Sequence, residues 1–177
     1  GVAKALIAKS PNGDEIREEF DCILSTTPSF SFPDLVELPA DYKKRLTDVH
    51  YLAAIVVVLE LDRPLTSYYW MNIADSDVPF LGLIEHTNML PKEWYDGRNI
   101  LYLTNYLDRT DDVYKMSKEE LLDLYLPHLT KFNPEFDRSW IKGTHYNALS
   151  TAQPIIGTNY SKAIPSHRTP INRLYLS

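Results

Sequence analysis

The sequence contains few glycines, and they are spread too widely to build a phosphate-binding loop. The six glycines stand at positions 1, 13, 82, 97, 143 and 157, so no two are closer than twelve positions. The Gly-x-Gly-x-x-Gly fingerprint and the Walker A loop both need closely spaced glycines, because the backbone must turn tightly against a phosphate. The 177 residues contain neither motif, and they also lack the Gly-x-Ser-x-Gly elbow of serine hydrolases.

Cysteine, basic clusters and long apolar runs are also scarce. The single cysteine, Cys22, excludes a disulfide framework, and because apolar residues follow it we expect a buried, inert thiol. The net charge is −6 and no block of Lys or Arg occurs, so nucleic acid is not an expected partner. The longest apolar run, residues 52–59, is far shorter than the roughly 20 residues of a membrane span. With no signal sequence at its start, the chain fits a reducing, cytoplasmic setting unless a targeting segment precedes it.

The histidines are spaced too widely to predict a metal site. A short-spaced pair of ligands is the usual sequence signature of such a site. Here all histidines lie at least 17 positions apart, and no metal is expected; they are His50, His86, His128, His145 and His167.

Strand-like segments dominate the chain. Residues 2–9 and 15–25 flank a turn, which predicts a hairpin, and the β-branched run at residues 52–61 predicts a central strand covered on both faces. Residues 148–165 resemble a loop. Because the connections are short, antiparallel pairing is favoured. Further strands are expected at residues 67–73, 80–86, 99–106, 139–146 and 174–176.

Two helices are expected between these strands. The spacing of apolar residues from Pro39 to Val49 predicts an amphipathic helix of about three turns. Ser117 and Glu120 form a capping-box pattern that opens a second helix, which Pro127 should kink. The prediction is an α+β fold with a mixed, mainly antiparallel sheet, helices packed on one face, and a small β-hairpin. The expected buried stripe of the second helix is Leu121, Leu122, Tyr125, Leu126 and Leu129.

Polar residues 85–88 follow the apolar strand at residues 80–84, and they allow two interpretations. Their side chains could cap the strand and satisfy backbone groups, or they could open onto a cleft, as strand ends often do. The aromatic residues 68–70 allow a similar pair of interpretations, either as core or interface residues or as a wall of a ligand site.

Three stretches resemble the superfamily of flavin-containing amine oxidases and protoporphyrinogen oxidases. Residues 20–28 (FDCILSTTP) are similar to the strand of that family that leaves the flavin domain, and residues 82–88 (GLIEHTN) look like a segment of its substrate domain. Residues 168–176 (RTPINRLYL) resemble its TP-x-x-GLYL strand, which leads back to the flavin, although Asn172 and Arg173 replace the usual Pro-Gly.

The resemblance implies a piece of a larger FAD-dependent oxidoreductase. Residues 1–30 would be a stub of the FAD-binding domain, residues 31–165 the substrate-binding domain, and residues 166–177 a return strand. The full-length parent would oxidise its substrate by hydride transfer to the flavin. Because the dinucleotide fingerprint lies outside these residues, we expect the chain alone to be inactive and not to bind FAD. The resemblance places the cofactor near Ser25, Thr26, Thr27 and Pro28.

The same resemblance suggests substrate contacts but no catalytic base. A small-molecule substrate and the missing FAD-binding part are the expected partners, and an uncovered apolar face should promote self-association. The competing hypothesis is a self-contained α+β module that encloses a small ligand without catalysis. The candidate substrate-binding residues are Tyr69, Glu85, His86, Asn88 and Gln153.

Overall fold

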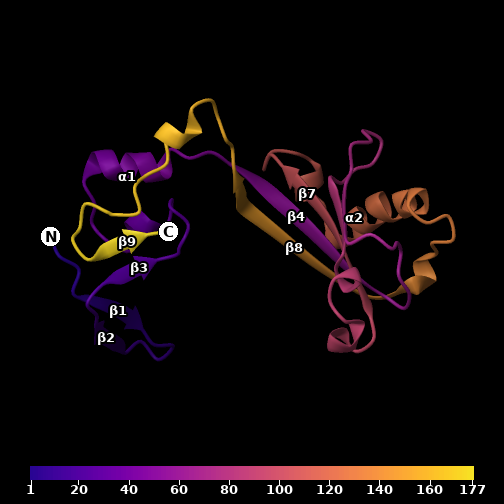
Figure 1. Cartoon of the computed structure of the whole chain (residues 1–177), viewed down its shortest axis with the longest axis horizontal. Helices are drawn as coiled ribbons and strands as arrows, with labels where there is room; N and C mark the ends of the chain where they lie inside the picture. The colour runs from indigo at the N-terminus through magenta and orange to yellow at the C-terminus, as the bar shows by residue number, and fades with distance from the viewer. The chain divides into compact units, whose positions relative to one another are not determined.

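The computed structural model describes all 177 residues, and these form two compact units (Figure 1). Unit 1 contains residues 1–50 and 155–177, and unit 2 is the continuous segment 51–154. The resemblance implied limits at 30/31 and 165/166, whereas the compact units divide at 50/51 and 154/155. The assignment of a flavin part and a substrate part to these segments stays a prediction. No helix is long and apolar enough to cross a membrane.

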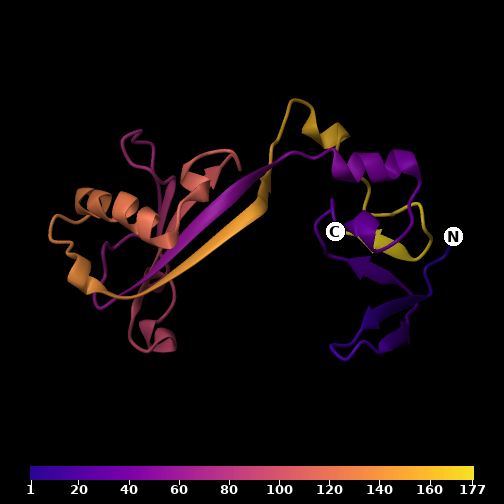
Figure 2. The same ribbon diagram turned by 180° about the vertical axis from the view of Figure 1, so that it is seen from behind.

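Unit 2 is built on a five-stranded sheet in which every neighbouring pair is antiparallel, as the short connections predicted. The strand order is β5-β6-β7-β4-β8, and Figure 2 shows β4 and β8 as long paired ribbons. The strands are β4 (Tyr51–Leu61), β5 (Trp70–Asn72), β6 (Gly82–Glu85), β7 (Asn99–Leu107) and β8 (Ile141–Pro154).

The two faces of this sheet differ in burial. On β4, Val57 and Leu59 are fully buried in the core, whereas Val56 and Val58 on the other face are only half-buried. The helix α2 (Lys118–Tyr125) and the 3₁₀ segment Leu126–Lys131 contribute to the core on the buried face. The sequence predicted that both faces of β4 would be covered, but only one face is fully buried. The prediction that helices pack on one face of the sheet is confirmed.

The start of α2 follows its sequence signature. The backbone N–H of Ser117 donates to Glu120 Oε2 at 2.8 Å, and the N–H of Glu120 donates to Ser117 Oγ at 3.3 Å, which completes the capping box. The α-helical geometry ends at Tyr125 and tightens to 3₁₀ before Pro127, because proline has no N–H to donate to the preceding turn. All five residues of the predicted stripe are buried.

The last strand of unit 2 is longer than predicted. We expected a strand to residue 146 followed by a loop, but β8 continues to Pro154. Its second half pairs with the start of β4, including Ala54 with Leu149 and Tyr51 with Pro154. Because this half is largely exposed and poor in β-branched residues, only its pairing with β4 makes it a strand.

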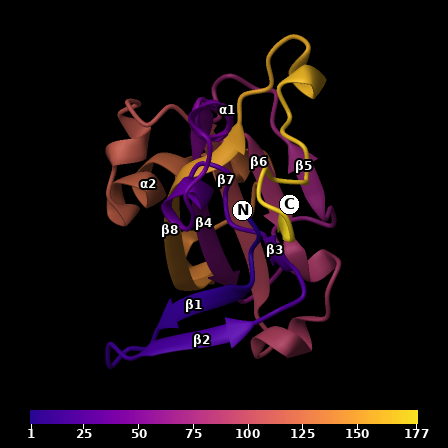
Figure 3. The same cartoon turned by 90° about the vertical axis from the view of Figure 1, so that its left-hand side faces the viewer.

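Unit 1 contains two separate strand pairs and one helix. The strands β1 (Ala5–Lys9) and β2 (Glu15–Glu19) form the predicted hairpin (Figure 3). The strand β3 (Ile23–Ser25) pairs in parallel with β9 (Leu174–Leu176), which joins the two sequence ends of the unit. The helix α1 (Ala40–Thr47) is shorter than the three turns expected. The buried core of unit 1 is Phe32, Tyr42, Leu46, Leu174 and Leu176.

Two residues of unit 1 differ from expectation or from the family pattern. Cys22 is exposed, so the prediction of a buried thiol was wrong: the residue lies just before β3, where pairing has not yet begun. Arg173 has a φ of 66°, a left-handed conformation that glycine adopts most easily. The backbone thus keeps the glycine-like turn before β9 although arginine stands there.

Candidate functional site

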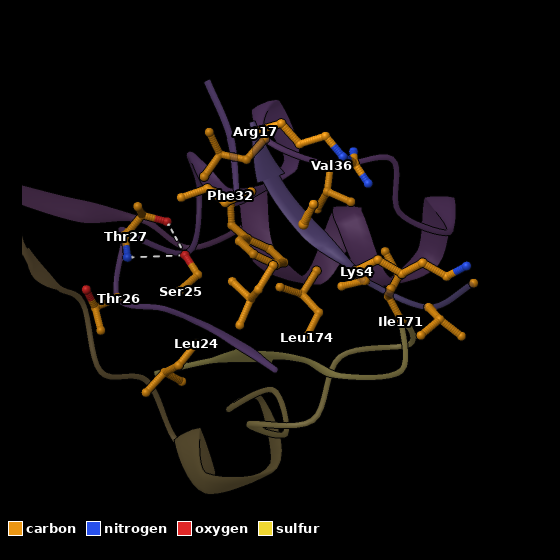
Figure 4. A pocket seen from close by; sticks show the side chains of 17 residues that line it. Lys4, Arg17, Leu24, Ser25, Thr26, Thr27, Phe32, Val36, Ile171 and Leu174 are labelled. Atoms are coloured by element: carbon orange, nitrogen blue, oxygen red, sulfur yellow. Dashed lines mark hydrogen bonds between the residues drawn. The ribbon is translucent and has the colours of Figure 1, made fainter. Parts of the chain in front are cut away.

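A largely apolar cavity of about 660 Å³ lies in unit 1, beside the end of β3. Figure 4 shows Phe32 and Leu174 near each other at its centre, and both belong to the core of the unit. Both the N-terminal segment 1–6 and the return segment, through Ile171, contribute to the lining. The cavity therefore depends on chain segments that are far apart in the sequence.

The predicted cofactor residues form one side of this cavity. Ser25, Thr26 and Thr27 line it, whereas Pro28 does not. The hydroxyls of Ser25 and Thr27 are 2.8 Å apart, and the N–H of Thr27 donates to Ser25 Oγ at 3.4 Å (Figure 4). The carbonyl of Ser25 accepts a hydrogen bond from the N–H of Ser177 at 3.0 Å. This turn is thus fixed by its own hydroxyls and by the chain after β9.

Two cationic side chains lie on another side of the cavity. Lys4 and Arg17 both line it, and in Figure 4 their charged groups lie away from the hydroxyls of Ser25 and Thr27. An apolar floor with hydroxyls at one end and cations at another suits a ligand that has a flat apolar body and an anionic group. A flavin dinucleotide has both features, so the lining fits it.

The second group of candidates lies in unit 2, where the carboxylate of Glu85 is completely buried. Its Oε1 accepts a hydrogen bond from the N–H of Leu65 at 2.8 Å, and its Oε2 accepts one from the N–H of Thr66 at 2.7 Å and another from Thr66 Oγ1 at 3.2 Å. Burial raises the pKa of the Glu85 carboxyl, and these hydrogen bonds oppose the rise. The two backbone N–H groups are buried or part-buried donors, and the carboxyl oxygens of Glu85 supply their acceptors.

Asn88 holds the same loop from its other side. Its Nδ2 donates to the carbonyl of Thr66 at 3.0 Å and to that of Tyr68 at 3.1 Å. Glu85 and Asn88 therefore bind backbone and side-chain groups of the segment before β5, as the structural interpretation of residues 85–88 predicted. That loop carries the aromatic residues Tyr68, Tyr69 and Trp70 into β5.

His86 lies among aromatic rings instead. Its Nε2 is 2.6 Å from the hydroxyl of Tyr95, and its ring packs edge-on against Tyr95 and Tyr102, with centroids 5.3 and 5.6 Å away. Burial raises the pKa of the Tyr102 phenol, and the nearby phenols of Tyr95 and Tyr69 raise it further. Tyr69, His86, Tyr95 and Tyr102 therefore form one cluster, which we call the tyrosine–histidine cluster.

The cluster lies on the half-exposed face of the sheet, which we call the open face. Cross-strand partners share a face, and Tyr102 is paired with Val58 and Ile84. Gln153 pairs with Leu52, six residues along β4 from Val58 and on a different edge strand from β5. The structure thus places Tyr69 beside the end of β6, where the N–H of Glu85 donates to its carbonyl at 2.8 Å, but leaves Gln153 at a distance on β8.

Sequence reasoning missed four of these residues. Tyr102 and Tyr95 carry no motif of their own, although Tyr102 alternates with buried residues along β7, which marks it for the opposite face. Lys4 and Arg17 meet the return segment only through the tertiary structure. No three His, Cys, Asp or Glu side chains lie close enough to one another to hold a metal ion.

The sequence model of the flavin-containing amine oxidoreductases matches residues 4–177. The chain belongs to this family. Among curated proteins, none matches the sequence significantly. The expected resemblance to flavin amine oxidases is therefore confirmed at the level of the family.

Solved structures share the fold at low sequence identity. An oxidoreductase from Methanosarcina mazei superposes with a TM-score of 0.64 at 17% identity, over 98% of this chain and 42% of that one. A protein from Exiguobacterium sp. 255-15 described as a protoporphyrinogen oxidase gives 0.60 at 13%, over 98% and 40%. A putrescine oxidase bound to putrescine gives 0.61 at 16%, over 92% and 38%. The chain spans about 40% of the length of these proteins.

Proposed function

We propose that this chain forms the substrate-binding region of an amine oxidase-like flavoenzyme, with two stubs of its FAD-binding domain at residues 1–30 and 166–177. The carrying observation is the cavity beside Ser25–Thr27, together with the match to the family over nearly the whole chain. The parent enzyme oxidises a small-molecule substrate by hydride transfer to FAD.

The cavity in unit 1 contributes one wall of the flavin site. The backbone and hydroxyls of the Ser25–Thr27 turn contact the cofactor, and the apolar floor around Phe32 excludes water from it. Lys4 offers positive charge to an anionic part of the ligand, and Arg17, whose guanidinium lies 3.4 Å from Glu19 Oε1, lies on the same side of the cavity. The bound flavin supplies the two-electron redox chemistry, and the protein supplies orientation and shielding.

The open face of unit 2 contributes the substrate side. Tyr69 and His86 contact substrate there, with Gln153 further along β8. Glu85 and Asn88 act indirectly, because their polar groups are already bound to the loop that carries the aromatic residues. Their role is to hold that loop in one position.

The deciding experiment compares the full-length parent with the 177-residue chain. We expect a flavin absorbance band at about 450 nm in the purified parent. Titration of the chain alone with FAD should show no tight, stoichiometric binding, because the glycine-rich fingerprint is absent. A colourless, inactive parent would contradict the proposed oxidoreductase activity and favour a ligand-binding module. Tight FAD binding by the chain alone would contradict the proposal that the FAD site needs residues outside this chain.

A pair of variants in the parent tests the cavity itself. Leu24 lines the cavity and is 59% exposed, whereas Leu149 in unit 2 is 55% exposed and lies outside it. Leu24→Trp should lower the flavin content of the purified parent because the new ring occupies cofactor space. Leu149→Trp should leave it unchanged. Equal flavin content in both variants would show that this cavity is not part of the cofactor site.

A further inference from the structure

The tyrosine–histidine cluster gathers residues from four separate segments of unit 2. Tyr69 precedes β5, His86 follows β6, Tyr95 lies in the 3₁₀ segment Lys92–Tyr95, and Tyr102 lies in the middle of β7. No single sequence motif joins them. Their convergence is thus a property of the fold.

Several polar atoms of the cluster have no protein partner. Nδ1 of His86 and the hydroxyls of Tyr102 and Tyr69 make no hydrogen bond within the protein, and all three side chains keep contact with solvent. Glu85 and Asn88, which neighbour His86 in the sequence, are occupied by the loop before β5. The free groups are therefore the ones able to bind a ligand.

The strands of the open face present few charged side chains to a ligand. Their open-face positions include no Lys or Arg, and the one acidic residue, Glu60, is bound by His145 Nε2 at 2.7 Å. These positions are Leu52, Ala54, Val56, Val58, Glu60, Trp70, Asn72, Gly82, Ile84, Ile100, Tyr102, Thr104, Tyr106, Gly143, His145, Asn147, Leu149 and Gln153.

We infer that Tyr102 and His86 form a hydrogen-bonding subsite for an uncharged polar group, such as a hydroxyl, a carbonyl or a neutral amine, next to an apolar or aromatic body. The inference deepens the proposed function and rests on it for the role of substrate. An anionic group finds no Lys or Arg on these strands, and the one carboxylate, that of Glu60, already has a hydrogen-bonding partner in His145. Moving a charged group onto this face costs hydration, and for an anion no Lys or Arg on these strands offsets that cost.

Tyr95 is the positioning residue of this subsite. Its hydroxyl lies 2.6 Å from Nε2 of His86, so it holds the orientation of the imidazole and leaves Nδ1 with the complementary role, donor or acceptor, toward a ligand. When the Tyr95 hydroxyl donates to Nε2, Nδ1 carries the proton and becomes a donor toward the ligand. Tyr95 itself needs no contact with the ligand.

Three probes that share one ring but differ in charge test the subsite on the 177-residue chain. Benzyl alcohol, benzylammonium and benzoate are titrated separately, and the ring signals of His86 and of the tyrosines are followed by NMR. Benzyl alcohol should shift the signals of His86 and Tyr102, and each charged probe should bind at least about five-fold more weakly. Equal or tighter binding of either charged probe, or no shift with benzyl alcohol, would overturn the inference.

Two phenol deletions on the same face of β7 locate the subsite. Tyr102→Phe should weaken benzyl alcohol binding by about 2- to 10-fold, because it removes one neutral hydrogen bond and keeps the ring. Tyr106→Phe removes a phenol hydroxyl from the same face outside the cluster, and it should leave binding unchanged. Equal losses in the two variants would show that the hydroxyl of Tyr102 is not a specific contact.

The positioning role of Tyr95 is tested through the ¹⁵N chemical shifts of the His86 imidazole. In Tyr95→Phe the ¹⁵N shifts of His86 should move toward a mixture of tautomers, and benzyl alcohol should bind about 2- to 3-fold more weakly. Unchanged ¹⁵N shifts would contradict the role. None of these measurements involves flavin, so the subsite can fail while the parent still binds FAD, and a colourless parent leaves the subsite result standing.

Discussion

The two compact units build their cores differently. In unit 2 a cluster of 16 buried apolar residues is formed by the continuous segment 51–154, with the sheet on one side and α2 on the other. In unit 1 only five residues form the buried cluster, and they come from both ends of the chain. Every residue of β2 is exposed, and a two-stranded hairpin alone is only marginally stable.

Because of this difference, the two proposed ligand surfaces lie on units of different expected stability. Unit 2 contains enough buried apolar surface to hold its open face rigidly, so its loops can present the tyrosine–histidine cluster. Unit 1 leaves a cavity of about 660 Å³ beside a small core. We expect unit 1 to open more readily, because few buried apolar contacts hold it together.

The largest expected effect comes from the core of unit 2. Leu59 is completely buried, so Leu59→Ala should lower the free energy of unfolding of unit 2 by about 2–5 kcal/mol, through lost burial and a residual cavity. Hydrogen exchange measured amide by amide reports each unit separately. Leu149→Ala, at a residue that is 55% exposed, is the control. An equal loss of protection in unit 1 would show that the units are not energetically separate.

The next largest effect concerns the hydrogen bonds by which Glu85 holds residues 65 and 66, in the loop before β5. In Glu85→Gln the amide offers an N–H₂ group where the carboxylate accepted, so one buried donor of Leu65 or Thr66 loses its partner. We expect a loss of about 1–3 kcal/mol in the stability of unit 2, with faster exchange at residues 65–70. Glu60→Gln, on the open face, should change that exchange little. Unchanged exchange in Glu85→Gln would mean that other contacts position the loop.

A smaller effect is expected at the start of α2. Ser117→Ala removes the side-chain cap and should cost about 1 kcal/mol in unit 2, measured by urea denaturation. Ser76→Ala, at an exposed turn, is the matched control. Hydrogen bonds from Ser117 hold the pKa of Glu120 below its ordinary 4.5. The box therefore stabilises the helix above pH 4.5, and its contribution is lost as the pH falls below that value and Glu120 takes up a proton.

The smallest effect lies in unit 1. A left-handed conformation costs a non-glycine residue about 1–2 kcal/mol, and substitution by glycine removes that cost. Part of the benefit is lost because glycine has greater conformational freedom in the unfolded chain. Arg173→Gly should therefore stabilise unit 1 by about 0.5 kcal/mol, seen as slower amide exchange in β9. Arg173→Ala keeps the strained conformation and should show no such gain. A loss in Arg173→Gly would indicate that the arginine side chain makes a stabilising contact.

The sequence alone predicted the parts of this protein that depend on local patterns. The capping box at Ser117, the buried stripe of α2, the β1–β2 hairpin and the antiparallel pairing follow from periodicity and turn chemistry over a few residues. The family followed from three short stretches at the two ends and in the middle of the chain. These features need no knowledge of distant segments.

The tertiary structure decided everything that depends on contact between distant segments. It extended β8 to Pro154 by pairing with β4, exposed Cys22, and used Glu85 to bind a loop 20 residues earlier. It also brought Tyr95 and Tyr102 to His86, and Lys4 and Arg17 to the cavity beside Ser25. The physical reason is that burial and hydrogen bonding depend on which segments meet in space, whereas the sequence pattern records only the conformation that each segment prefers by itself.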